Sequence, residues 1–178
     1  DITWHKIIEK IAKKNKPIII ATGASNFSEV KKAVNKILNK NNKLILMQCN
    51  TNYNPNFENY NFINLNVLKT YHKEFKNKVI LGLSDHTFGS QTVLGAVAMG
   101  AKVVEKHFTD NNLREGPDHK FSMNPITWKQ MVNDTRILEK SLGNGKKYIE
   151  KNEIDSSVVQ RRSVRTKLNL LKGIKIEK

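Results

Sequence analysis

Four short apolar runs, each followed by an amphipathic stretch, constrain the fold of this 178-residue chain more than any other feature. They are Ile18–Ile20, Leu44–Met47, Val79–Leu83 and Val103–Val104. Runs of this length are typical of buried strands, whereas apolar residues spaced at i, i+3, i+4 and i+7 are typical of helices. Strands that alternate with helices along a chain form parallel sheets. The sequence therefore predicts an α/β fold of four βα units.

The predicted helices lie between and around these runs, at 3–14, 30–38, 62–76, 93–98 and 124–142. The last of them begins with Asn124 and Pro125, a capping residue followed by proline in the first turn, and Gly143 ends it. Residues 1–145 are thus expected to form one βα domain. Residues 146–178 are expected to be a polar linker and the truncated start of a small β module, because a short alternating stretch surrounds Val164.

Composition narrows the classes of partner. The formal net charge is +15, but the lysines are spread along the chain without an Arg-rich block or interleaved aromatic residues. We therefore favour a solvated basic surface that attracts anionic substrates over a nucleic-acid interface. No apolar run approaches the roughly 20 residues of a membrane span, so no membrane partner is expected. The single cysteine, Cys49, forms no internal disulfide and suits a cytoplasmic location.

Polar and ionisable residues follow all four apolar runs. They are Thr22, then Asn50 and Thr51, then Ser84, Asp85 and His86, and then Glu105 and His107. The carboxyl ends of parallel strands lie at one edge of a sheet, where ligands bind in βα folds. The sequence therefore predicts one site at this edge.

Two histidines in this set can jointly hold a divalent metal, because imidazole is a good ligand for several transition ions. His86 and His107 follow neighbouring strands, and Asp85 and Glu105 can supply charge or orient the ligands. The alternative, in which both histidines are hydrogen-bonded structural residues, stays open. Similarly, Thr22–Ser25 can bind phosphate at a helix start or simply cap the helix.

Three motifs resemble the sialic acid synthase family. They are Gly82–Thr87 (GLSDHT), Glu105–Thr109 (EKHFT) and Gly116–His119 (GPDH), and Cys49–Tyr53 and Arg161–Ser163 fit in order. The resemblance covers essentially the whole chain. It implies the C-terminal half of a TIM (β/α)8 barrel, strands five to eight, followed by the start of an antifreeze-like module.

The resemblance also implies an activity. That family condenses phosphoenolpyruvate with an N-acetylated amino sugar such as N-acetylmannosamine, and its relatives make legionaminic and pseudaminic acids. The full-length protein is expected to be a homodimer with a Mn2+ or Mg2+ cofactor.

The same resemblance assigns roles to individual residues. His86 and His107 match the two metal ligands, and Glu105 and Asp85 are the catalytic candidates. The substrate-binding candidates are Thr22, Thr51, Tyr53, Ser84 and Asp118; Ser84 matches a phosphoenolpyruvate contact, whereas Tyr53 and Asp118 match residues near the amino sugar. One departure is Ala21, where the family usually has a serine that touches phosphate.

Two alternatives to this function remain. A full barrel of this type has roughly 250 residues, so four βα units form only half of one and leave two sheet edges open. The chain is thus expected to be inactive alone, and the first alternative is a non-catalytic or self-associating fragment. The second is another phosphoenolpyruvate-condensing sugar-acid synthase.

Overall fold

The computed structural model describes residues 2–53 and 56–175. The chain divides into two compact units, Asp1–Gly143 and Asn144–Lys178. The sequence places this boundary after residue 145.

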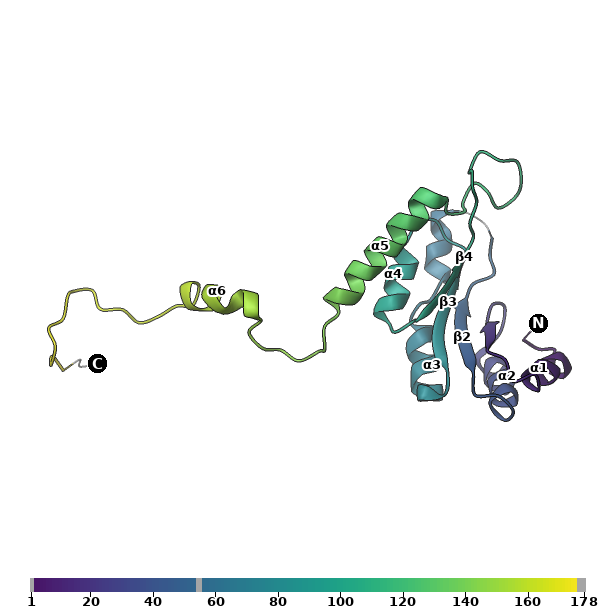
Figure 1. Ribbon diagram of the computed structural model, residues 1–178, viewed down its shortest axis with the longest axis horizontal. Coiled ribbons are helices and arrows are strands. Elements are labelled where there is room, and N and C mark those ends of the chain that lie inside the picture. Colours follow the sequence, from purple (N-terminus) through teal and green to yellow (C-terminus); the bar gives the residue numbers. More distant parts are fainter. Residues whose placement is uncertain (1, 54–55, 176–178) are drawn as a thin grey trace. The chain divides into compact units, whose positions relative to one another are not determined.

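The first unit contains a sheet of four parallel strands in chain order (Figure 1). The strands are β1 (Ile18–Ala21), β2 (Leu44–Cys49), β3 (Ile80–Asp85) and β4 (Val103–Lys106). Each strand pairs only with its neighbours in sequence, as expected when every connection is a right-handed βα crossover. All four predicted strands are therefore present, and β3 and β4 extend two residues beyond their apolar runs.

Five α-helices accompany this sheet in the described part of residues 2–143. They are α1 (His5–Ala12), α2 (Phe27–Leu38), α3 (Val67–Phe75), α4 (Gln91–Ala98) and α5 (Pro125–Ser141). Two 3-10 helices, η1 (Phe57–Phe62) and η2 (Lys76–Lys78), flank α3. The helix predicted at 62–76 begins later, at Val67, because Phe62 belongs to η1 and residues 63–66 form a non-helical connection.

The helices pack against one face of the sheet and bury its core. Alternate strand residues, including Leu44, Leu46, Leu81 and Leu83, are almost fully buried on this face. They contact apolar residues of the helices, such as Val30, Val34, Ile37, Leu68 and Val93. This period-two burial of strand residues against helices is the pattern that the apolar runs predict.

The opposite face of the sheet carries the other half of each strand. The strand register places Ile19, Ile45 and Ile80 side by side, followed by a layer of Ala21, Met47, Gly82 and Val103. Ile19 and Ile80 remain 57% and 50% exposed. Met47 lies over Gly82, where an added Cβ would be 2.8 Å from Met47 Cγ. This uncovered face is called the inner face below.

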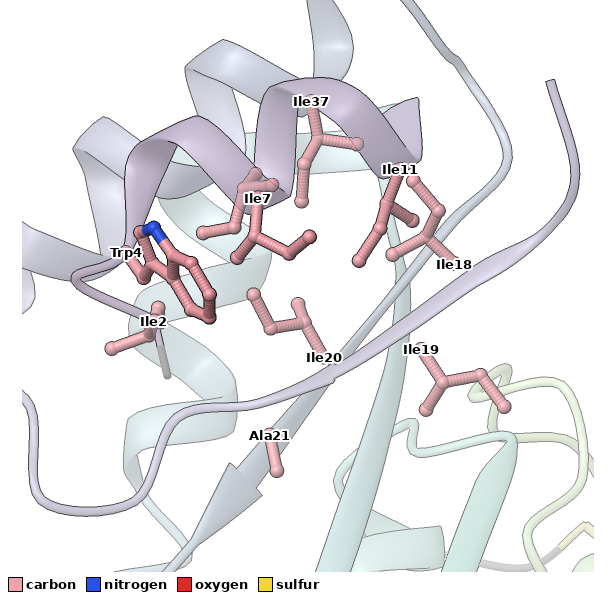
Figure 2. Close-up of a pocket in the computed structure, with 10 residues that line it drawn as sticks. Ile2, Trp4, Ile7, Ile11, Ile18, Ile19, Ile20, Ala21 and Ile37 are labelled. Carbon is pink, nitrogen blue, oxygen red and sulfur yellow. The ribbon is translucent and has the colours of Figure 1, made fainter. Parts of the chain in front are cut away.

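The β1 edge of the sheet is open. Ile18 and Thr22 donate their backbone N–H groups to Lys43, just before β2, and to Met47 of β2, so the N–H groups of Ile19 and Ala21 point to the free edge. A groove of about 360 Å³ lies between this edge and α1, and its lining is apolar. Figure 2 shows Ile7 and Ile11 of α1, together with Trp4 just before this helix, over the strand residues of β1.

The second unit differs from its sequence-based expectation. Residues predicted as a linker contain η3 (Lys151–Glu153) and the short helix α6 (Ile154–Val159). No strand forms in residues 144–175, although a β module was expected to begin there. Among the helices that the structure describes, none is both long and apolar enough to cross a bilayer.

Candidate active site

The inner face becomes polar at the carboxyl ends of β2, β3 and β4. The strand register places Cys49 beside Ser84, and Ser84 beside Glu105. Ser84 Oγ donates a hydrogen bond of 2.8 Å to Glu105 Oε1. Cys49 completes the row as a buried thiol, and burial raises the pKa of this thiol. This row of Cys49, Ser84 and Glu105 lies next to the apolar layers, towards the carboxyl ends of the strands, and is called the floor of the candidate site.

Two histidines lie one inner-face position beyond this floor. His86 follows β3, His107 follows β4, and their ring centroids are 5.2 Å apart. Tyr53 contacts both rings edge-on, at centroid distances of 4.5 Å to His86 and 5.5 Å to His107. The structure thus brings together three residues from three separate strand ends.

His86 is held in one tautomer by its surroundings. Its Nδ1 lies 2.9 Å from the backbone oxygen of Asn50. Because a carbonyl oxygen can only accept, Nδ1 carries the proton and the neutral ring leaves its Nε2 lone pair available. Burial of the ring lowers the pKa of His86, an effect that outweighs the Asn50 hydrogen bond. His86 is therefore a neutral imidazole at physiological pH.

The loop after β4 supplies the outer part of the site. Asp118 Oδ2 lies 3.5 Å from His107 Nδ1, and its side chain is 47% exposed. Phe121 packs against the other side of the His107 ring, at a centroid distance of 5.0 Å. Asp118 thus combines contact with a histidine and access to solvent, as a residue that meets an incoming ligand requires.

The histidines open into a cavity of about 240 Å³ at the ends of β3 and β4. Its lining residues are Asp85, His86, Glu105, Lys106 and His107. Ligand sites usually occupy about 300–1,000 Å³. The cavity is below that range, and it lies at the carboxyl end of the inner face.

The donor set fits a divalent cation. Each imidazole has a partner at Nδ1, the Asn50 carbonyl oxygen for His86 and the Asp118 carboxylate for His107, and metal-binding histidines usually have such partners. Among the described residues there is no group of three or more His, Cys, Asp and Glu arranged to hold a metal. A cation here would complete its coordination with water or substrate oxygens, so the metal site stays a prediction.

Asp85 is turned away from these groups. The strand register pairs it with Lys106 on the helix-facing side, where the two side chains are 0% and 1% exposed. Lys106 Nζ lies 2.5 Å from Asp85 Oδ2. The catalytic role predicted for Asp85 stays a prediction, and its position does not favour contact with a substrate that lies beside Glu105.

Thr22 and Thr51 also lie outside the row of Ser84 and Glu105. Thr22 is buried; its hydroxyl donates to the backbone oxygen of Met47 and accepts from Tyr71 of α3. Thr51 is exposed and packs against Gly23, where an added Cβ would lie 2.2 Å from Thr51 Cγ2. The structure therefore separates Thr22 from the histidines, whereas Thr51 stays accessible.

The helix start after β1 is capped by its own side chains. Asn26 Oδ1 accepts the backbone N–H of Glu29, and Glu29 in turn accepts the backbone N–H of Asn26. This reciprocal capping box occupies donors that a phosphate would use. Of the two interpretations of Thr22–Ser25, the geometry favours the ordinary helix start.

Comparison with known proteins identifies the family. Residues 1–147 match the NeuB family. The chain belongs to the NeuB family. Its relatives include N,N'-diacetyllegionaminic acid synthase of Campylobacter jejuni, 38% identical over 97% of this chain and 51% of the relative. An uncharacterised protein of Methanocaldococcus jannaschii is 42% identical over 97% of the chain and 50% of that protein.

A solved structure matches the fold of this NeuB family chain. The crystal structure of N-acetylneuraminic acid synthetase from Leptospira borgpetersenii superposes with a TM-score of 0.78 and 29% identity, over 90% of this chain and 54% of that one. The α/β prediction is confirmed, and the curled four-stranded parallel sheet is half of a TIM-type barrel. The chain spans about half the length of the relatives it matches.

Sequence reasoning missed two residues of this NeuB family site. Cys49 was considered only as an unpaired cysteine, yet the register places it in the row with Ser84 and Glu105. Lys106 was not singled out, although it lies between Glu105 and His107 in the sequence. A buried lysine needs a charged partner, and the two-residue alternation of β3 and β4 assigns that partner as Asp85.

Proposed function

We propose that this chain supplies the metal-binding half of a nonulosonic acid synthase. The reaction is the condensation of phosphoenolpyruvate with an N-acetylated amino sugar and water. Carbon 3 of phosphoenolpyruvate forms a bond to the sugar aldehyde carbon, water adds at carbon 2, and the C–O bond to phosphate breaks. The products are a nine-carbon or related nonulosonic acid and inorganic phosphate.

The row of Ser84 and Glu105 is proposed to hold the reacting end of phosphoenolpyruvate. Ser84 presents its hydroxyl to phosphoenolpyruvate when its hydrogen bond to Glu105 is exchanged for one to the substrate. Glu105 is an exposed residue whose carboxylate can accept a proton from the attacking water. Tyr53 and the exposed Asp118, which lie on the outer side of this row, are proposed to contact the amino sugar. Thr51 is proposed to lie at the edge of the substrate site.

His86 and His107 are proposed to hold Mn2+ or Mg2+ through their Nε2 atoms. The ion would act as a Lewis acid towards the sugar aldehyde. The Asn50 carbonyl and the Asp118 carboxylate orient the two rings at their opposite nitrogens. The observation that carries the proposal is this convergence of Ser84, Glu105, His86 and His107 on one inner face.

Other features of the intact protein are part of the same proposal. The four strands correspond to strands five to eight of the barrel, and the second unit to the start of an antifreeze-like module. The intact protein is expected to be a homodimer in the cytoplasm.

Reconstitution tests the proposed reaction. The chain is co-expressed with the part of the Campylobacter legionaminic acid synthase that it does not match, and phosphate release is measured. Release is expected only when Mn2+, phosphoenolpyruvate and an N-acetylated amino sugar are all present. The chain alone is expected to release none. A purified 1:1 assembly that consumes neither substrate contradicts the proposal.

The choice of sugar separates the two enzymatic alternatives. Phosphate release with a pentose phosphate, and none with any amino sugar, would identify another sugar-acid synthase instead. The His86→Ala variant, assembled in the same way, is the control for catalysis by the site rather than by a contaminant. A panel of N-acetylated amino sugars then identifies the preferred substrate.

Self-association is a second candidate, favoured by the open β1 edge and its apolar groove. An exposed strand edge next to apolar surface is a template for pairing with another chain. If the chain acts as a self-associating fragment, it forms dimers or larger species at micromolar concentration, measured by analytical ultracentrifugation. Ile19→Lys, at a 57% exposed position of that edge, is expected to shift it towards monomer.

A further inference from the structure

A buried ion pair lies directly behind the two histidines. Strand alternation sends the side chains of Ser84 and His86 to the inner face and that of Asp85, between them, to the helix-facing side. On the neighbouring strand, Lys106 lies between Glu105 and His107 in the same way. Asp85 and Lys106 pair in the register, and Lys106 Nζ contacts Asp85 Oδ2 at 2.5 Å. This ion pair therefore links the ends of β3 and β4, and the His86 and His107 rings project from the residues that follow directly.

The same pair fixes the residue that follows His86. Thr87 donates its backbone N–H to Asp85 Oδ1 at 3.1 Å and its hydroxyl to the same oxygen at 2.9 Å. Lys106 Nζ also donates to the backbone oxygen of Thr87. His86 is thus held between two neighbours, Asp85 and Thr87, that are both tied to Lys106.

Helix α4 completes this network from its first turn. Thr92 Oγ1 donates to Asp85 Oδ2 at 2.7 Å and lies 3.0 Å from Thr87 Oγ1. Both Asp85 oxygens are therefore occupied, and each partner is buried. The side-chain contacts of this pair are thus with protein groups, although both residues border the cavity beside the histidines.

We propose that Asp85 and Lys106 are positioning residues, which set the orientation and separation of the His86 and His107 rings. The orientation of the rings depends only on the described contacts. Its consequence for metal affinity rests on the proposed function.

Energetics favour this role over a contribution to stability alone. A buried ion pair is often no more stabilising than two apolar side chains of similar size, whereas removal of one partner leaves an uncompensated charge. Apolar residues would hold β3 against β4 and α4 equally well. They would not accept the Thr87 N–H or donate to its carbonyl, and those bonds fix the backbone on both sides of His86.

A double replacement is the principal test. Asp85→Leu combined with Lys106→Met, made in the 178-residue chain, removes the polar network but leaves no buried unpaired charge. Cooperative unfolding and circular dichroism report whether the fold is kept. Lys31→Met with Glu74→Leu is the control, because that ion pair also joins two elements, α2 and α3, at 2.5 Å, although its side chains are 49% and 32% exposed.

The first measurement needs no metal. Long-range proton–nitrogen spectra of the histidine rings distinguish a protonated Nδ1 from a protonated Nε2. The wild-type chain and the Lys31/Glu74 control are expected to show His86 in the Nδ1–H form set by Asn50. The Asp85/Lys106 variant is expected to show averaging between the two tautomers, which a merely structural role would not produce.

The second measurement is a Mn2+ titration followed by the resonance signal of the free ion. Replacement of groups that orient metal ligands usually lowers metal affinity about 10–100-fold. That loss is expected in the Asp85/Lys106 variant, with no change in the control. If the wild-type chain binds no Mn2+ but the ring spectra of the variant change, the positioning role stands and the proposed metal site fails.

A milder variant covers the case in which the double replacement does not fold. Thr92→Val removes one hydrogen bond to Asp85 Oδ2, whereas Thr92→Ser retains the hydroxyl. A smaller change of the His86 ring spectrum is expected for Thr92→Val, with recovery in Thr92→Ser. Wild-type ring spectra in a folded Asp85/Lys106 variant, or in Thr92→Val when only that variant folds, overturn the proposal.

Discussion

Ser84 and Glu105 are joined across two neighbouring strands by a hydrogen bond of 2.8 Å from Ser84 Oγ to Glu105 Oε1. The hydroxyl is the donor, and Glu105 accepts through one oxygen of its carboxyl group. Ser84 is almost fully buried, whereas Glu105 reaches the surface of the inner face. The pair thus presents one carboxylate, held in a fixed direction, to whatever occupies the cavity.

The first prediction concerns the carboxylate of Glu105. Glu105→Gln keeps the shape of the side chain and the ability to accept from Ser84, but it removes the base. In the reconstituted protein it is expected to lower kcat at least about 100-fold, the range usual for a lost general base. Mn2+ binding should change little, because the two histidines remain. A kcat within about threefold of wild type would exclude a role as base.

Ser84 provides a contrast with Glu105. Ser84→Ala removes a single hydroxyl that is proposed to contact phosphoenolpyruvate. Loss of one such hydrogen bond is expected to raise the KM for phosphoenolpyruvate about 10-fold. The KM for the amino sugar should stay near the wild-type value. An effect confined to the amino sugar would assign Ser84 to the other substrate.

The second prediction concerns the metal. His86→Ala or His107→Ala is expected to abolish Mn2+ binding by the reconstituted protein, measured by titration calorimetry, because each removes one of two imidazole ligands. A chelator should stop phosphate release, and added Mn2+ should restore it. His72→Ala, on the exposed side of α3, is the control. Unchanged Mn2+ binding in both His86→Ala and His107→Ala would contradict the two-histidine site.

The third prediction is a dependence of stability on pH. Burial lowers the pKa of His86 in the folded chain below its value of 6.5 in the unfolded chain. Below pH 6.5 the unfolded state therefore binds a proton that the folded state resists. This contribution to the free energy of unfolding is fully present above pH 6.5 and is lost as pH falls through the lower, folded pKa.

Urea unfolding of the metal-free chain at pH 7.5 and at pH 5 measures this loss. His86→Gln removes the titrating ring, so its stability is expected to fall less between the two pH values than that of the wild type. An equal or greater fall in the variant would show that other groups cause the dependence.

The fourth prediction concerns the contact between Gly23 and Thr51. A Cβ on Gly23 would lie 2.2 Å from Thr51 Cγ2 and 3.0 Å from Cys49 Sγ. Gly23→Ala is therefore expected to lower the free energy of unfolding by about 1–3 kcal/mol, as is usual for overpacking. Thr51→Ser removes the Cγ2 methyl group.

A double-mutant cycle tests that contact. Gly23→Ala combined with Thr51→Ser is expected to recover most of the lost stability, because the clashing methyl group is gone. The coupling free energy of the pair is measured by urea unfolding of all four proteins. Additive effects of the two substitutions would show that the strain arises at Cys49 instead.

The apolar runs were sufficient to predict the strands and most of the helices. Runs such as Leu44–Met47 are apolar because most of their side chains are buried, so their composition predicts their position in the fold. The start of the helix before Phe75 was less predictable, since η1 occupies residues through Phe62 and α3 begins only at Val67. Short helices such as α6 carry little periodic signal, so a polar segment containing one looks like a linker.

The sequence was sufficient to predict that the site lies at the strand ends. It was not sufficient to predict which face of the sheet each polar side chain occupies. Ser84, Asp85 and His86 were treated as one polar group that follows an apolar run, whereas β3 continues to Asp85 and sends alternate side chains to opposite faces. Thr22 was grouped with the site for the same reason. Its side chain, one residue after Ala21 of the inner face, lies on the helix-facing side. The face that the last residues of a strand occupy depends on where the strand ends. The polar composition of these residues does not reveal the end of the strand.

The open β1 edge has a consequence for the stoichiometry of any closed barrel. In the described part of residues 2–143, five α-helices accompany four strands, because α1 precedes β1 and α5 follows β4. An eight-stranded barrel has one helix for each strand. Two copies of this sheet joined from β4 to β1 would bring α5 of one copy and α1 of the other to the same junction. A partner that closes the ring without this conflict contributes four strands but only three helices, and both its first and its last element are strands.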